Sequence, residues 1–345
     1  MRKLPLGAHG PDVSALTLGT MNFGEQVDAG RSHDLLDIAF AGGINCFDTA
    51  ESYTSPMREA TQGESERVLG QWLQRVPRQQ VVVASKVSGP AAKLRYLRGG
   101  PQLVRQQIRE ALNASLGRLQ IDKVDIYQVH WPARSTNYFG RLGYAPREDK
   151  GATPILHTLE ALSELQDEGL VQHIGVSNET PWGLMHYLAL AKQHSLTRVT
   201  SLQNPFSLLN RVIEIGLGEV LHREAIGLMA YAPLCDGVLS GKHRQGPAHE
   251  ASRLGRWPDY YDRYTTPAGR AATEQYCELA EKHGLAPADM ALAWVLSRPE
   301  VTTAVIGVSN EAQLRQSLAA ASITLPAEVR KAIGRVHAES PNPCP

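Results

Sequence analysis

The chain has 345 residues, of which 42% are hydrophobic, and this length and composition allow either one large α/β barrel or two ordinary domains. Lysine and arginine together number 35, as do aspartate and glutamate, so no chain-wide charge would draw the protein to nucleic acid or to an anionic membrane. The four cysteines are widely spaced and form no C-x-x-C motif, which argues against a disulfide framework and against a cysteine zinc site.

Short apolar or β-branched runs alternate with longer amphipathic runs along the chain. The expected strands are 15–19, 44–47, 81–85, 124–130, 173–177, 199–203, 226–232 and 303–307. The expected helices between the earlier strands are 32–43, 65–76, 102–119, 155–169 and 181–194. This alternation predicts parallel strands joined by crossover helices.

Eight strand candidates favour a closed (β/α)8 TIM barrel, as a single domain over residues 1–345 with a C-terminal helical extension. An open dinucleotide-binding sheet should show G-x-G-x-x-G after its first strand. The nearest approach, "GLGEVL" at 216–221, lacks the third glycine and follows no strand. Residues 131–153 and 235–270 are too long for ordinary connections, and we expect them at the C-terminal face as functional lids or disordered loops.

Ionisable residues follow three consecutive strands. Asp48 comes after "INCF", Lys86 after "VVVAS" and His130 after "VDIYQV", while Tyr53 lies shortly beyond Asp48. Period-two counting places His130 on the same strand face as Gln128. Any one of these residues alone is more often structural, as a solvated strand end, a turn cap or a core histidine. Their coincidence at neighbouring strand ends indicates a site.

These four residues suit one kind of chemistry. An ammonium beside a phenol stabilises phenolate, so Lys86 is expected to lower the pKa of Tyr53. Asp48 would balance a partly buried Lys86, and a neutral His130 could donate a hydrogen bond to a substrate oxygen. The set could protonate a carbonyl oxygen as hydride reaches the carbonyl carbon.

The strand-end motifs resemble those of the aldo-keto reductase superfamily. The motifs are "GINCFDTAESY", "VVVASKVSGP" and "VDIYQVHWP", and the likeness extends from "LGTMNFGEQ" to "AIGRVHAESPNP". "YQVHWP", "IGVSNET" and "LQNPFSLLNR" are most similar to the bacterial Tas-type branch. The resemblance implies a barrel that uses NADPH to reduce aldehydes or ketones. It implies Tyr53 as the proton donor, Asp48 and Lys86 as the residues that tune it, and His130 as the residue that orients the carbonyl.

The same resemblance implies a set of cofactor-binding residues. Those for the nicotinamide are Ser177, Asn178, Gln203 and the stacking Tyr231; for the pyrophosphate, Leu234, Gly237, Leu239 and Lys242; for the adenosine phosphate, Ser252 and Arg253; and for the adenosine, Gly307, Ser309 and Gln313. Gln316 and Ser317 stand where relatives commonly have Glu-Asn against the adenine. If Arg253 is only a solvated loop residue, Lys242 or Arg315 would hold the phosphate instead.

Two further groups have alternative interpretations. Trp131, Tyr138 and Tyr144 either line a substrate pocket or pack their loop onto the barrel. The cations Lys93, Arg95 and Arg98 either meet an anionic substrate or lie in a solvated loop.

Three functions compete at this stage. The first is an NADPH-dependent carbonyl reductase in the cytoplasm, since no signal-peptide pattern or membrane-length apolar run occurs. The second is a cofactor-bound regulatory barrel with little turnover, like the potassium-channel β-subunits that the cofactor segment also resembles. The third, a metal-dependent hydrolase, lacks any H-x-H or H-E-x-x-H motif. The expected partner is a small aldehyde or ketone, while its identity and the oligomeric state stay open.

Overall fold

The computed structural model describes residues 1–139, 141–244, 250 and 252–345. Eight parallel strands close into a barrel in the order β10-β3-β4-β5-β6-β7-β8-β9. They are β3 (Leu16–Gly19), β4 (Cys46–Asp48), β5 (Val82–Val87), β6 (Val124–Val129), β7 (Val171–Ser177), β8 (Ser201–Pro205), β9 (Gly227–Tyr231) and β10 (Thr303–Ile306). Each strand overlaps one of the predicted runs, so the predicted (β/α)8 barrel is confirmed.

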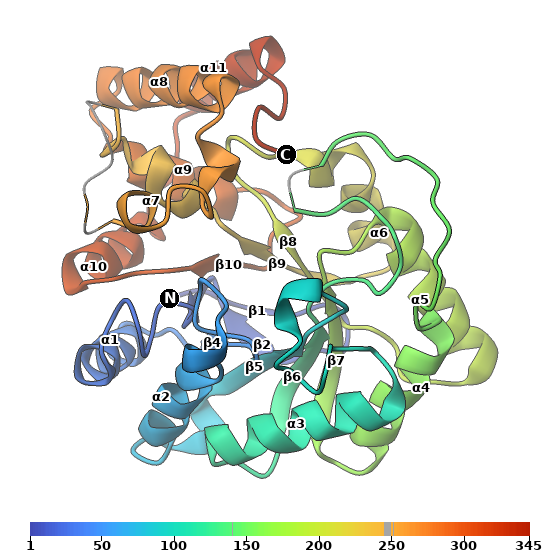
Figure 1. Ribbon diagram of the computed structural model, residues 1–345. Coiled ribbons are helices and arrows are strands. Elements are labelled where there is room, and N and C mark those ends of the chain that lie inside the picture. The colour runs from blue at the N-terminus through green and yellow to red at the C-terminus, as the bar shows by residue number, and fades with distance from the viewer. Residues whose placement is uncertain (140, 245–249, 251) are drawn as a thin grey trace.

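Helices surround the barrel (Figure 1). They are α1 (Ala29–Ala41), α2 (Glu64–Leu73), α3 (Arg105–Leu119), α4 (Ile155–Asp167), α5 (Pro181–His194), α6 (Leu217–Arg223), α7 (Arg253–Arg256), α8 (Pro267–Lys282), α9 (Pro287–Leu296), α10 (Glu311–Ala320) and α11 (Ala327–Glu339). The first five match the predicted amphipathic runs. α11 packs against α8 and forms the C-terminal helical extension.

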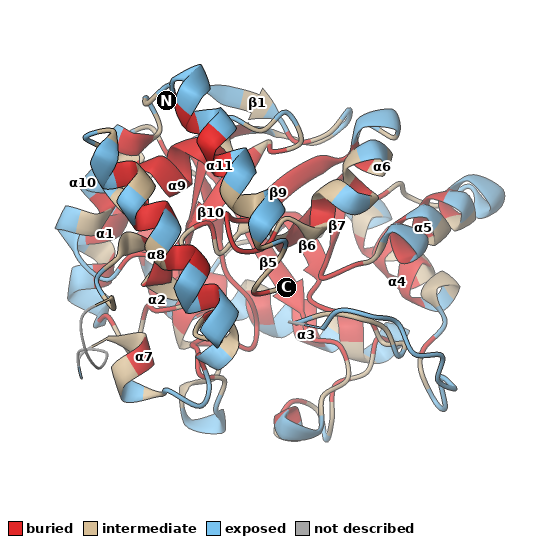
Figure 2. Cartoon of the chain, turned by 90° about the horizontal axis from the view of Figure 1, so that it is seen from above, coloured by how far each residue is buried: buried red, intermediate tan, exposed pale blue. Residues whose placement is uncertain are grey.

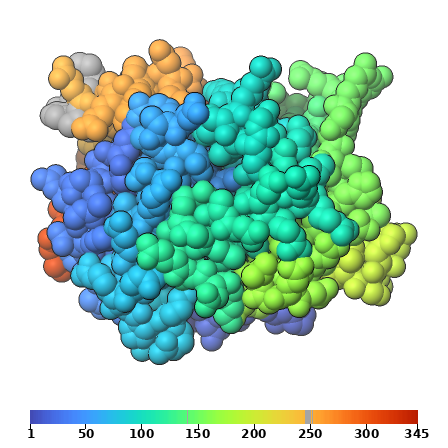
Figure 3. Space-filling model, turned by 60° about the horizontal axis from the view of Figure 1, so that its bottom comes forward, coloured from blue at the N-terminus to red at the C-terminus, as the bar shows by residue number. Residues whose placement is uncertain are grey.

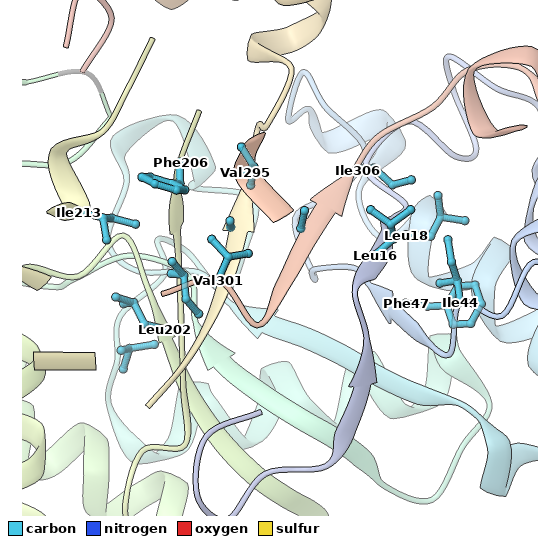
Figure 4. Close-up of a cluster of buried hydrophobic side chains, with 14 of the residues drawn as sticks. Leu16, Leu18, Ile44, Phe47, Leu202, Phe206, Ile213, Val295, Val301 and Ile306 are labelled. Carbon is cyan, nitrogen blue, oxygen red and sulfur yellow. The ribbon is translucent and has the colours of Figure 1, made fainter. Parts of the chain in front are cut away.

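Alternation along the strands divides their side chains into two buried groups. Leu18, Phe47 and Leu202 have 0% exposure and belong to the large cluster between strands and helices (Figure 4). Smaller or flexible side chains such as Ala84 and Met229 form a separate cluster. Most helices are buried on one side and exposed on the other (Figure 2), as amphipathic sequences require, whereas α9 has no exposed residue.

A short antiparallel hairpin precedes the barrel and was not predicted from the sequence. It pairs β1 (Lys3–Pro5) with β2 (Asp12–Ser14). Leu6 and Val13 are fully buried in the same cluster as Ala84 and Met229. Ser14 N donates to Asn45 Oδ1 at 2.7 Å, just before β4 begins, so the hairpin lies at the N-terminal end of the strands.

The two long segments follow β6 and β9. The described residues of 131–153 form no helix or strand, whereas those of 235–270 include η5 (Cys235–Ser240), α7, η6 (Asp262–Tyr264) and the start of α8. Residues 140, 245–249 and 251 belong to these segments and lie outside the described residues. In Figure 3 the residues after β5, in teal, and those after β6, in green, protrude from the same edge of the molecule. Within the described part of the chain, no helix is long and apolar enough to cross a membrane.

Gly227 lies where the loop of the β1–β2 hairpin packs closely against the barrel, so a substitution there tests how close this packing is. A Cβ at this position would lie 2.6 Å from Gly7 N and 2.7 Å from the Leu6 carbonyl carbon. Because both contacts are backbone, Gly227→Ala is expected to lower the free energy of unfolding by about 1–3 kcal/mol. Gly117→Ala in α3 is the control, since a Cβ there meets nothing within 4 Å and alanine favours a helix. Thermal denaturation showing equal stability for both variants would contradict the tight seal.

Candidate active site

Strand register brings the predicted catalytic residues to one end of the barrel. Asp48 pairs with Ala84 on β5, and Lys86 pairs with Gln128 on β6. His130 follows directly after β6. Because all strands of a parallel barrel point the same way, their C-terminal ends meet at one rim. Acid, ammonium and imidazole therefore reach the same space.

Lys86 lies at the centre of this group. Its Nζ donates to Asp48 Oδ2 at 2.6 Å and to the Thr49 carbonyl at 2.8 Å. The same nitrogen lies 3.5 Å from the Tyr53 hydroxyl. The Lys86 side chain is 0% exposed and that of Asp48 is 3% exposed. Burial lowers the pKa of Lys86, and the Asp48 carboxylate opposes this change by stabilising the ammonium.

Lys86 was expected to lower the pKa of Tyr53, but the net change in this structure is in the opposite direction. Burial raises the pKa of the Tyr53 phenol well above its ordinary value, and the Asp48 carboxylate raises it further. The Lys86 ammonium, 3.5 Å from the hydroxyl, favours the phenolate but does not outweigh burial and the Asp48 charge. Tyr53 is therefore a neutral hydroxyl at neutral pH, the form that can donate a proton.

His130 faces the phenol across the site. Its ring centre lies 5.5 Å from that of Tyr53, with the two rings nearly perpendicular. Burial lowers the pKa of His130 well below its ordinary value, and the Lys86 charge lowers it further. A neutral imidazole retains one N–H donor, so the structure is consistent with a donor role toward a carbonyl oxygen.

Two buried glutamines complete the contacts of Asp48. Gln203 Nε2 donates to Asp48 Oδ1 at 2.8 Å, and Gln128 Nε2 lies 3.4 Å from the same oxygen. Both carboxylate oxygens therefore have partners, as a buried charge requires. Gln128 was not singled out from the sequence, although an amide on the same strand face as His130 was the available signal.

The residues assigned to the nicotinamide lie together at the ends of β7, β8 and β9. Asn178 Nδ2 donates to the His130 carbonyl at 2.9 Å and to Ser177 Oγ at 3.1 Å. Tyr231 donates its hydroxyl hydrogen to Asn178 Oδ1 at 2.7 Å, and Ser177 Oγ donates to the Gln203 carbonyl at 2.7 Å. Both Nδ2 hydrogens of Asn178 are engaged, while its Oδ1 can accept one further hydrogen bond.

The residues assigned to the phosphates also converge. Arg253 is not a solvated loop residue, because its guanidinium donates to Asp236 Oδ1 at 2.8 Å and to Asn22 Oδ1 at 2.7 Å, with the side chain 14% exposed. Lys242 is exposed and has no carboxylate within 4.0 Å among the described residues, and its pKa is lowered by partial desolvation and by the Arg253 charge. Lys242 could therefore meet a phosphate group without losing an ion-pair partner, whereas Arg253 would have to share its guanidinium with Asp236.

The other residues assigned to the phosphates lack a side chain, are buried or partly buried, or cap a helix. A Cβ on Gly237 would lie 3.1 Å from Lys242 Nζ, so the absent side chain leaves room there. Leu239 is buried at 1% exposure, and Leu234 packs against the core. Ser252 Oγ caps α7 by accepting from Gly255 N at 3.1 Å.

The residues assigned to the adenosine lie at β10 and the start of α10. A Cβ on Gly307 would lie 3.5 Å from the Arg253 guanidinium, which links this region to the cation pair. Ser309 N donates to Gln313 Oε1 at 2.9 Å. Gln316 Nε2 donates to Asp289 Oδ1 on α9 at 2.8 Å, and Ser317 Oγ donates to the Gln313 carbonyl at 2.9 Å. The amide nitrogen of Gln316 is therefore engaged by a neighbouring helix.

The aromatic residues after β6 divide into two sets. Trp131 is 3% exposed, donates to the Pro90 carbonyl at 3.1 Å and lies 4.7 Å from the His130 ring. Tyr138 packs against the same small cluster as Trp131. Tyr144 is 63% exposed, so it does not line the site in this structure. Trp131 thus packs its loop onto the barrel beside the site.

The three cations after Lys86 also separate. Lys93 and Arg95 are exposed, as expected for a solvated loop. Arg98 instead donates to both Glu51 carboxylate oxygens, at 2.6 and 2.9 Å. Neither alternative from the sequence describes Arg98, because Glu51, its buried partner, was not recognised. Among the described residues, no group of three or more His, Cys, Asp or Glu side chains could hold a metal ion.

Comparisons with known proteins match almost the whole chain. The model of the Aldo/keto reductase family matches residues 15–338. "Protein tas" of Escherichia coli (strain K12) is 44% identical over 336 residues, covering 97% of each chain. An "Aldo-keto reductase" of Babesia bovis is 34% identical over 69% of this chain and 88% of its own. The "Uncharacterized oxidoreductase YrpG" of Bacillus subtilis (strain 168) is 31% identical over 96% of this chain and 94% of its own.

Buried His130 gives a testable dependence of stability on pH. The pKa of His130 is lower in the folded protein than in the unfolded chain, so the unfolded chain binds a proton at a pH where the folded protein does not. The free energy of unfolding therefore falls as pH falls below about 6.5. The loss approaches about 1.4 kcal/mol per pH unit until the folded pKa is reached. His130→Gln should therefore lose less stability than wild type between about pH 7 and about pH 5.

The control is His9→Gln, because His9 is exposed and its removal should leave the slope unchanged. Thermal or denaturant unfolding across this pH range measures all three proteins. An identical slope for wild type and His130→Gln would contradict the effect of burial.

Proposed function

Because the chain belongs to the aldo/keto reductase family, we propose that it is an NADPH-dependent oxidoreductase that reduces aldehydes or ketones to alcohols. The observation that carries the proposal is the buried Lys86 that contacts Asp48 and Tyr53, with His130 facing the phenol. The matched relatives that are named reductase or oxidoreductase agree with an enzyme rather than a regulatory barrel. Oxidation of NADPH in the presence of an aromatic aldehyde tests the activity directly.

Each residue of the site has a distinct part in this proposal. Bound NADPH would supply the hydride, which delivers an electron pair to the carbonyl carbon. His130 donates a hydrogen bond to the carbonyl oxygen, and Tyr53 transfers its phenolic proton to that oxygen as the negative charge develops. Lys86 stabilises the phenolate that is left, and solvent returns the proton. Asp48 keeps Lys86 charged within the barrel.

The contacts of the site support the cofactor assignment. Tyr231 is held by its hydroxyl at Asn178, so its ring is available as a flat support for a nicotinamide. Lys242 and Arg253 would hold phosphate oxygens, and Arg253 is the cation nearer Gly307 and the adenosine residues. We assign Ser309, Gln313, Gln316 and Ser317 to the adenosine side on the same basis.

Tyr53→Phe should remove nearly all carbonyl reduction while leaving the Kd for NADPH close to that of wild type. The substitution deletes only the hydroxyl, and loss of a general acid typically costs about 100-fold or more in kcat. The control is Tyr144→Phe, which removes a hydroxyl from an exposed residue. Steady-state kinetics and fluorescence titration with NADPH measure both effects. Retention of most activity by Tyr53→Phe would exclude it as the donor.

Arg253→Ala should weaken NADPH binding much more than NADH binding. The two cofactors differ by a phosphate, and a charge-assisted contact of this kind contributes about 1.5–3 kcal/mol, or roughly ten- to a hundred-fold in affinity. Titration of wild type and variant with each cofactor measures the difference. Equal losses for both cofactors would refute the assignment, and a selective loss in Arg315→Ala instead would move the phosphate contact to α10.

A further inference from the structure

Glu51 occupies an unusual position in the loop that carries Tyr53. It lies between the end of β4 and the phenol, and its side chain is only 1% exposed. Its backbone N donates to the Lys86 carbonyl at 3.2 Å, and its Oε1 accepts from Ser88 N at 2.7 Å. Glu51 therefore ties the loop after β4 to the end of β5, on either side of the Tyr53–Lys86 contact.

Arg98 is the cation that balances this buried carboxylate. It forms two hydrogen bonds with Glu51, and its own side chain is 14% exposed. Its backbone φ is +51°, which costs free energy for a residue with a side chain, and it is followed by Gly99 and Gly100 at positive φ. The chain thus adopts a strained turn at the residue whose guanidinium reaches Glu51.

The segment that ends in Arg98 is anchored beside the substrate side of the site. Leu94 and Leu97 are buried in one small cluster with Trp131, which lies against His130. Two planar hydrogen bonds fix both distance and orientation, which an apolar contact does not. The Glu51–Arg98 pair therefore connects the loop of the proposed proton donor to the segment that packs beside the proposed carbonyl site.

The backbone hydrogen bonds of Tyr53 itself do not reach β5. The backbone N of Tyr53 donates to the Ala50 carbonyl at 3.1 Å within the loop, and its carbonyl accepts from Gly63 N at 2.7 Å. Neither contact reaches the end of β5, where Lys86 lies. Glu51 is the loop residue nearest Tyr53 in sequence that bonds to the end of β5, so how Glu51 is held influences the distance between the Tyr53 hydroxyl and Lys86 Nζ.

From this geometry we infer that Glu51 and Arg98 are positioning residues for proton donation by Tyr53. They hold the phenol at the correct place between Lys86 and the carbonyl oxygen without touching the substrate themselves. The inference rests on the proposed carbonyl reduction. Because a displacement of about 1 Å at a reacting group can cost about 100-fold, loosening the pair should lower kcat and leave cofactor binding unchanged.

The test uses Arg98→Lys, which keeps the positive charge but loses the paired hydrogen bonds. The matched control is Arg118→Lys, because Arg118 pairs with Glu66 at 2.7 Å and the two side chains are 14% and 0% exposed, a burial like that of the Arg98 pair. Both variants should lose similar stability. Only Arg98→Lys should lower kcat, by about ten- to a hundred-fold, with an unchanged Kd for NADPH and a larger solvent isotope effect on kcat.

The double variant Glu51→Gln, Arg98→Met separates positioning from folding. It removes both charges, so no buried charge is left unpaired, and it should fold while its kcat stays low. Wild-type kcat in the folded double variant, or equal kcat losses in Arg98→Lys and Arg118→Lys, would overturn the inference alone. Absence of carbonyl reduction by wild type would overturn the proposed function and the inference with it.

Discussion

The buried ion pair between Lys86 and Asp48 is the interaction on which the site depends. An ammonium with 0% exposure is tolerated only if hydrogen-bond acceptors surround it, and these are the Asp48 carboxylate and the Thr49 carbonyl. Asp48 in turn needs donors, which Gln203 and Gln128 provide from two other strands. One charge inside the barrel thereby fixes polar side chains on four strands, so the barrel must close in a single register for the charge to be satisfied.

Burial also sets the protonation states that the proposed reaction needs. The same exclusion of water raises the pKa of the Tyr53 phenol and lowers that of His130. Both side chains are therefore neutral near pH 7, and both can act as hydrogen-bond donors toward an oxygen that gains negative charge. The Lys86 charge, 3.5 Å from the hydroxyl, favours the phenolate and so opposes part of this rise in the pKa of Tyr53.

The two sides of the site are built differently. The proposed cofactor side would draw on short polar contacts at the ends of β7 to β10 and on Lys242 and Arg253 in the segment after β9. The proposed substrate side would depend on Trp131 and its apolar neighbours, which pack long connections onto the barrel. Glu51 and Arg98 join the proton-donor loop to this second side, so substitutions far from the substrate can alter the proposed chemistry.

Sequence pattern alone determined the eight strands, because apolar periodicity is a local property of the chain. It also determined their parallel arrangement and the meeting of Asp48, Lys86 and His130, because parallel strands of a barrel all end at the same rim. Tyr53 already stood beside Asp48 in that pattern, and motif resemblance added its proton-donor role and the expected cofactor residues. Only the tertiary structure decided the β1–β2 seal, the Gln128 contact, the pairing of Arg98 with Glu51 and the raised pKa of Tyr53. Each of these depends on which residues, distant in the sequence, are buried together. The degree of burial then decides how strongly their charges interact. A local pattern does not contain that information, since Glu51 and Arg98 are 47 residues apart in the chain.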